Sequence, residues 1–125
     1  FERLIGIVLI GQTELAQKLS ENNPAVREVV QRCELVTLQP LTDGKLRDYL
    51  KFKFERVGKN WNEVLNDSAL DAIAQRLNQR QRVAKGTVET SLLYPLAVNN
   101  LVSAAINQAA ELGFDIVDAD VVQGV

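Results

Sequence analysis

Two apolar segments near the start of the chain have the pattern of buried β-strands. Residues 4–10 (Leu-Ile-Gly-Ile-Val-Leu-Ile) and 35–38 (Leu-Val-Thr-Leu) are almost continuously aliphatic, which is typical of strands covered on both faces. Between them, Thr13 is a suitable N-cap for one helix, and residues 24–32 predict a second, short one. Strand, helix, helix, strand is an α/β order. Two strands alone leave open sheet edges, so we expect the rest of the sheet in residues that precede this chain.

From residue 42 onward, the apolar positions repeat at the three-to-four spacing of amphipathic helices. Cap, proline and glycine signals predict helices that begin at Thr42, Asp67, Pro95 and Asp118, with Gly58 and Gly113 ending the first and third. The third helix has the clearest buried face, formed by Val98, Leu101, Val102, Ala105, Ile106 and Ala109. The polar segment 79–90 predicts an exposed loop or small hairpin.

Composition is that of a packed globular domain. The chain has 125 residues, of which 46% are apolar, enough for one domain with a hydrophobic core. Its net charge of -2 argues against nucleic-acid binding over the whole surface, although a local basic face is compatible with it. The lack of histidine and the single cysteine, Cys33, exclude imidazole catalysis, histidine metal ligands and an intrachain disulfide. We expect a reducing, cytoplasmic setting and no membrane partner, because no apolar run could span a bilayer.

Several segments, in order along the chain, resemble the ExeA-like and transposition-ATPase branch of AAA+ proteins. Residues 6–15 (Gly-Ile-Val-Leu-Ile-Gly-Gln-Thr-Glu-Leu) are similar to its sensor I strand. Residues 29–33 (Val-Val-Gln-Arg-Cys) and 35–41 resemble its next block, a helix that ends in Gln-Arg followed by a strand and Pro-Leu. Residues 48–58 resemble the first helix of the lid, and 94–101 (Tyr-Pro-Leu-Ala-Val-Asn-Asn-Leu) resemble the sensor II helix. Within this branch the chain looks closest to the phage Mu B-type transposition proteins.

The resemblance implies an α/β fragment that is mostly α. Residues 1–41 would form the C-terminal portion of a AAA+ P-loop core, with the sensor I strand and the arginine-finger region. Residues 42–125 would form a helical lid bundle. The sequence also contains no methionine, so we expect Phe1 to lie inside a longer protein rather than at a native start.

The resemblance assigns candidate catalytic roles to three residues in the first part. Gln12 occupies the sensor I position beside the γ-phosphate, where an amide can donate to phosphate and accept from the attacking water. Arg32 aligns with the arginine finger, which reaches the ATP of a neighbouring subunit, and Arg27 is the second candidate. The alternatives are that Gln12 only caps a strand end and that both arginines are ordinary solvated helix residues.

The sensor II segment departs from the family pattern. Family members carry arginine directly after the proline, where it contacts the γ-phosphate, but here Leu96 follows Pro95. Either the lid does not sense nucleotide in this way, or Arg82 or Lys85 substitutes, and the plain alternative is that Leu96 simply packs. Walker A and Walker B motifs are absent. The resemblance therefore implies ATP and Mg²⁺ as cofactors of the longer protein, and no ATP hydrolysis by this chain alone.

Basic residues gather in two places. The first group lies on or beside the first lid helix and is interleaved with acids, which favours a solvated face: Lys45, Arg47, Lys51, Lys53, Arg56 and Lys59. The second group has no acid within its span and is a candidate contact for DNA phosphates: Arg76, Arg80, Arg82 and Lys85.

The resemblance implies an ATP-dependent, DNA-binding protein of a phage or prophage that acts in DNA transposition. Such a protein binds DNA without sequence preference, self-associates into an oligomer or filament, and delivers the target DNA to a transposase. Two alternatives stay open. One is an ExeA-like ATPase of a type II secretion assembly, and the other is a helical protein-interaction module without a nucleotide role.

Overall fold

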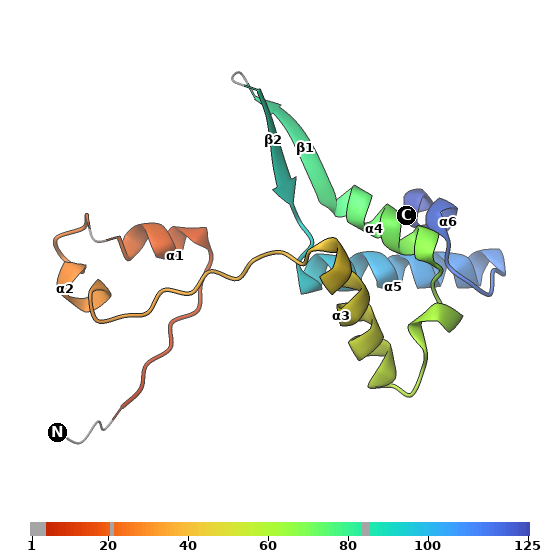
Figure 1. Cartoon of the computed structure of the whole chain (residues 1–125), viewed down its shortest axis with the longest axis horizontal. Coiled ribbons are helices and arrows are strands. Elements are labelled where there is room, and N and C mark those ends of the chain that lie inside the picture. The colour runs from red at the N-terminus through yellow and green to blue at the C-terminus, as the bar shows by residue number, and fades with distance from the viewer. Residues whose placement is uncertain (1–4, 21, 84–85) are drawn as a thin grey trace. The chain divides into compact units, whose positions relative to one another are not determined.

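The computed structural model shows a mostly helical chain that divides into two units (Figure 1). It describes residues 5–20, 22–83 and 86–125, with backbone only at residues 43, 79–83 and 86–90. Unit 1 spans Phe1–Thr37 and unit 2 spans Leu38–Val125. The division lies slightly before the predicted boundary at residue 41, because the Leu41 amide donates to the Leu93 carbonyl at 2.7 Å and its side chain packs against the core of unit 2.

Unit 1 contains two short helices, α1 (Thr13–Lys18) and α2 (Arg27–Val30). Both predicted helices are therefore present, although α2 is shorter than predicted. The N-cap of α1 is Gln12 rather than the predicted Thr13, and the Gln12 carbonyl accepts from the Leu15 amide at 2.9 Å. A shift of one residue at a helix start is common where two neighbouring polar residues can both occupy the cap.

The two predicted strands are not formed. Residues 5–10 and 35–38 have no strand assignment, and Leu4 lies outside the described residues. Side chains in both segments are exposed, from 60% at Leu9 to 90% at Ile10 and 79% at Leu38. The physical reason is that a strand is defined by hydrogen bonds to a neighbour, and none of the described residues of unit 1 supplies one.

Unit 2 holds the remaining elements, and each helix predicted there is present. In chain order they are α3 (Asp43–Glu55), the 3₁₀ turn η1 (Trp61–Glu63), α4 (Asp67–Leu77), β1 (Asn78–Val83), β2 (Gly86–Ser91), α5 (Pro95–Leu112) and α6 (Ala119–Gly124). Of the two alternatives for the polar segment 79–90, a loop or a small hairpin, the structure shows the hairpin, because β1 pairs antiparallel with β2. No helix within the described ranges is long and apolar enough to cross a membrane.

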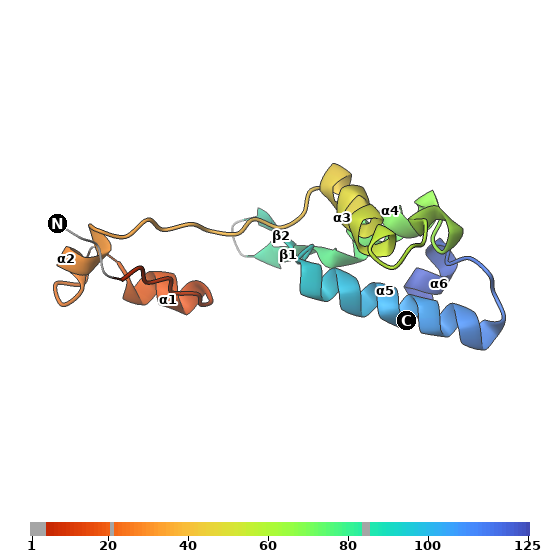
Figure 2. The ribbon, with the colours of Figure 1, turned by 90° about the horizontal axis from the view of Figure 1, so that it is seen from below.

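The core of unit 2 lies between its helices. Figure 2 shows α5 along one side, with α3 and α4 on the other and α6 between α4 and α5. The most deeply buried side chains are aliphatic: Leu46, Leu50, Leu65, Ile73, Leu93, Val98, Val117 and Val122. Burying a side chain of this size contributes about 1.5–3 kcal/mol, so these contacts are the main stabilising term of the unit.

Local signals fix both ends of α5. Pro95 occupies the first helical turn, where the missing amide costs no hydrogen bond. Gly113 ends the helix in the left-handed region with φ +75°, a conformation that glycine adopts without steric cost. Gly58 behaves alike after α3, with φ +71°.

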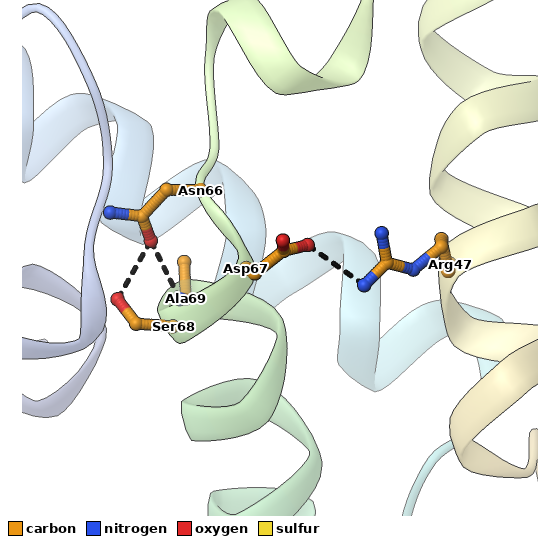
Figure 3. Close-up of polar contacts among 5 residues, drawn as sticks. All are labelled: Arg47, Asn66, Asp67, Ser68 and Ala69. Carbon is orange, nitrogen blue, oxygen red and sulfur yellow. Dashed lines mark hydrogen bonds and ion pairs between the residues drawn. The ribbon is translucent and has the colours of Figure 1, made fainter.

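The N-terminus of α4 is capped by Asn66, not by the predicted Asp67. The Asn66 Oδ1 accepts from the Ala69 amide at 3.0 Å and from the Ser68 hydroxyl at 2.7 Å (Figure 3). The Asp67 carboxylate instead pairs with Arg47 of α3 at 2.8 Å. Asn66 has the extended backbone of an N-cap residue, and Asp67 is the first residue inside the helix. Both residue types suit the cap, so the prediction was one residue late.

The cap of α4 is also joined to α6. The Ser68 hydroxyl accepts from the Ala119 amide at 3.2 Å, and the Asn66 amide donates to the Val117 carbonyl at 3.1 Å. Asp118 caps α6 as predicted, accepting from the Val121 amide at 3.0 Å. The start of α4 and the start of α6 therefore form one hydrogen-bonded junction.

We expect Asn66→Ala to lower the free energy of unfolding by about 1 kcal/mol, because the cap acceptor is lost. Asn66→Asp keeps an oxygen acceptor and serves as the matched control. Urea denaturation followed by the fluorescence of Trp61, the only tryptophan, measures both. Equal stability of the alanine and aspartate variants would contradict the capping role.

Candidate functional site

Gln12 has an exposed side chain at the start of α1. It holds the N-cap position through its backbone only, since its side chain makes no capping hydrogen bond. The alternative that it caps a strand end does not describe this chain, in which residues 5–10 form no strand. The amide is therefore not used by the helix that it precedes, and it can donate to a phosphate or accept from water.

Arg32 follows α2 and pairs with Glu28 one turn earlier. The distance between the Arg32 guanidinium and the Glu28 carboxylate is 3.1 Å, and the two side chains are 78% and 85% exposed. An exposed helical pair at this spacing contributes only about 0.3–0.5 kcal/mol, so the guanidinium can leave it for a stronger anion at little cost. Arg27 is exposed at the first position of α2.

Pro95 and Leu96 lie in the first turn of α5, where the resemblance places sensor II. Leu96 is 72% exposed, so the plain alternative that it simply packs is wrong. Tyr94, the N-cap residue, is also exposed at 40%. The first turn of α5 thus presents apolar side chains to solvent, at the position where the family that the sequence resembles carries a phosphate-binding arginine.

Arg76 is not an unattached surface cation. Its guanidinium donates to the Val122 carbonyl in the last turn of α6 at 2.6 Å. A cation at the C-terminal end of a helix is favourable because the carbonyls there carry partial negative charge. Arg76 therefore links α4 to α6, a structural contact that sequence reasoning missed.

The hairpin carries two other predicted DNA contacts, Arg80 and Arg82. The register pairs Arg80 with Glu89 and Arg82 with Thr87. An acid therefore lies opposite one of the arginines, although none lies between Arg76 and Lys85 in the sequence. Lys85 itself lies outside the described residues.

Two members of the first basic group have partners within unit 2. The Arg47 guanidinium pairs with Asp67 and lies 5.1 Å from the centre of the Trp61 ring, a cation–π contact. Lys51 pairs with Glu55 at 3.8 Å on the same helix. These partners support the interpretation of the first group as a solvated face rather than a nucleic-acid surface.

A groove of about 500 Å³ lies between α3 and α4. Its polar lining comes from Arg47, Asp71, Gln75 and Asn78, and Leu46 and Leu70 form part of its floor. The charges at Arg47 and Asp71 oppose each other, and Arg47 is held by Asp67. The groove is therefore not strongly biased toward an anion or a cation.

The sequence also did not predict a hydrogen bond between α3 and α5. The Tyr49 hydroxyl donates to the Asn99 Oδ1 at 2.9 Å in a partly buried setting. Asn99 lies inside the segment 94–101 that resembles the sensor II helix. That resemblance was the only feature of the sequence that pointed to Asn99. This bond fixes α3 against α5 close to the exposed first turn.

No group of three or more histidine, cysteine, aspartate or glutamate side chains that could hold a metal ion occurs in the part of the chain that the structure describes. Comparisons of the chain with models of known protein families, with curated proteins and with solved structures give no match. Candidate roles therefore depend on the geometry above and on the resemblance of the sequence segments.

Proposed function

We propose that this chain is part of a AAA+ ATPase of the Mu B type, which binds DNA in an ATP-dependent manner and acts in DNA transposition. The observation that carries the proposal is the contrast between the two units. Unit 2 has a closed aliphatic core, whereas the described residues of unit 1 include no buried side chain. The aliphatic segments 5–10 and 35–38 therefore need a partner that covers them.

A parallel P-loop sheet is the partner that suits these two segments best. Strands in such a sheet are buried on both faces, so their sequences are continuously apolar rather than alternating. Segment 5–10 has this composition, with Ile5, Ile7, Val8, Leu9 and Ile10 all exposed here. In the proposed protein these segments join the sheet of a AAA+ core, and unit 2 is the lid that follows it.

The exposed first turn of α5 supports the same proposal. A lid helix that contacts nucleotide must present its first turn outside the lid core, as α5 does at Tyr94 and Leu96. With leucine in place of arginine, this turn can cover the nucleotide but cannot pair with its phosphates. In the proposed protein, Gln12 contacts the phosphate in its own subunit and Arg32 contacts it from the neighbour, with Arg27 as the second candidate.

This chain can supply only part of an ATP site. An exposed amide at Gln12 and an exposed guanidinium at Arg32 fit a phosphate, but the sequence has no glycine-rich phosphate loop. When bound, ATP and Mg²⁺ provide the phosphoryl group and the charge neutralisation of hydrolysis. In the proposal they are held by the AAA+ core of the longer protein. The oligomer or filament of that protein binds DNA and engages a transposase.

The test is DNA binding by the full-length protein. We expect fluorescence anisotropy with a labelled duplex of arbitrary sequence to show binding that requires ATP and weakens steeply as salt rises, since phosphate contacts release counterions. An unrelated duplex should bind equally well. Absence of binding at low salt, with and without ATP, would overturn the proposal and favour an ExeA-like secretion ATPase or a helical interaction module.

A further inference from the structure

The hairpin β1–β2 contributes none of the described side chains in the aliphatic core of unit 2. It leaves the end of α4 and returns to the start of α5, and Figure 1 shows it extending away from the helices. Val83 and Val88 are the only apolar residues in its two strands. An isolated two-stranded hairpin is marginally stable in water. The polar composition of both strands favours a polar partner.

The two faces of the hairpin differ in charge. Side chains alternate between faces along a strand, and directly opposed residues share a face. The register Arg80↔Glu89 and Arg82↔Thr87 therefore places both arginine positions on one face. That face also holds the paired positions Asn78 and Ser91. We call these six positions the arginine face.

The opposite face carries no charge. It holds the pairs Gln79↔Thr90, Gln81↔Val88 and Val83↔Gly86. All the charged positions of the two described strands are thus on the arginine face, together with asparagine, threonine and serine, which are common donors to phosphate oxygens. This segregation favours a polyanionic partner that approaches the hairpin from one side.

We infer that the arginine face of the hairpin binds the sugar–phosphate backbone of duplex DNA, with Arg82 as its main contact and with Glu89, at the position opposite Arg80, opposing the binding. The inference rests on the proposed function and names the part of the lid that performs the DNA binding. A two-stranded ribbon fits the DNA major groove, which is about 12 Å wide. Phosphate contacts carry no sequence information, which agrees with binding to arbitrary duplexes.

Glu89 allows a prediction in which a substitution strengthens DNA binding. The register places the acidic position 89 directly opposite position 80, and negative charge on this face repels an approaching phosphate. Position 82 lies opposite the uncharged Thr87. Removing the carboxylate is therefore expected to strengthen DNA binding, whereas removing Arg82 weakens it.

The experiment measures duplex binding by the full-length protein with ATP, by anisotropy over a salt series. We expect Arg82→Ala to weaken binding about five- to tenfold and to reduce the salt slope by roughly one. Glu89→Gln should strengthen binding two- to fivefold, on the order of one partly screened charge. Gln81→Ala, on the uncharged face, is the matched control and should leave the affinity unchanged. Misfolding cannot produce the gain at position 89.

The outcomes separate this inference from the proposed function. ATP-dependent DNA binding that none of the hairpin variants alters would overturn the inference and leave the proposed function standing. Absence of DNA binding by the unaltered protein would overturn both. Preferential binding of single-stranded RNA or of polyglutamate through the same residues would overturn the assignment to duplex DNA.

Discussion

Leu50→Ala is expected to lower the free energy of unfolding of unit 2 by about 2–5 kcal/mol. Leu50 lies on α3 and is only 2% exposed within the aliphatic core. Its truncation removes buried methyl groups and leaves a cavity that the neighbouring helices fill only in part. A domain of this size has a total stability on the order of 5–15 kcal/mol, so the variant is expected to be substantially unfolded at moderate urea concentrations.

Leu96→Ala is the matched control, because it makes the same chemical change on a helix of the same unit. Leu96 is 72% exposed, so its truncation should change stability by no more than about 0.5 kcal/mol. Urea titrations followed by Trp61 fluorescence measure both variants, with unchanged m-values expected. A large loss at Leu96 would show that this side chain packs, and would remove one support for a lid that faces a nucleotide.

The helices of unit 2 could be predicted because their signals are local. The apolar spacing of α5, the proline at its start and the glycine at its end all lie within the element itself. Each of these features acts through sterics or hydrogen bonds within one or two turns. The hairpin was predicted only as one of two alternatives, because a polar segment with Gly86 between two helix patterns fits an exposed loop equally well.

The strands could not be predicted in the same way, because a strand forms only by hydrogen bonding to a second strand, which can be far away in the sequence. Segment 5–10 has the composition of a buried strand, yet its residues are exposed and unpaired here. Strand propensity largely expresses how well a side chain fits a covered, pleated surface. Composition therefore predicted the preference of the segment for a covered surface, and none of the described residues of unit 1 pairs with it as a strand.

The errors at the candidate site have a common cause in long-range contacts. Arg76 reaches Val122, and Tyr49 reaches Asn99, across 46 and 50 positions of sequence. No local pattern contains these partners.

The hairpin illustrates how topology changes the meaning of a charge cluster. In the sequence, the arginines at 80 and 82 are equivalent members of one basic group. The register gives one of them an acidic neighbour, Glu89, which is nine positions away. The net charge of one face of a hairpin therefore depends on both strands and cannot be counted along one strand alone.

In the proposed ATPase, Arg32→Ala is expected to lower ATP turnover about 10³-fold, the effect of losing an arginine finger. ATP binding should be retained, because the arginine acts on charge that develops in the transition state. Steady-state hydrolysis by the full-length oligomer, together with binding of a fluorescent ATP analogue, measures both quantities. Oligomer size is checked by light scattering, so that loss of assembly is distinguished from loss of catalysis.

Glu28→Gln is the matched control for Arg32→Ala, since it breaks the same ion pair from the other side. If Arg32 only pairs with Glu28, both variants lose the same weak surface contact and should differ little from the unaltered protein. If Arg32 acts in a neighbouring subunit, Glu28→Gln keeps turnover and frees the guanidinium. Equal turnover in the two variants would contradict the arginine-finger role.

Mixing two inactive variants tests whether Arg32 acts between subunits. Gln12 is proposed to act in the subunit that holds the ATP and Arg32 in its neighbour, so Gln12→Ala and Arg32→Ala damage opposite sides of one interface. In mixed oligomers, an Arg32→Ala subunit that supplies Gln12 can lie beside a Gln12→Ala subunit that supplies Arg32. Such interfaces are complete, so turnover should return on mixing although neither variant is active alone. Continued inactivity of mixed oligomers, with assembly preserved, would place Gln12 and Arg32 on the same side of the interface and remove the proposed division of roles.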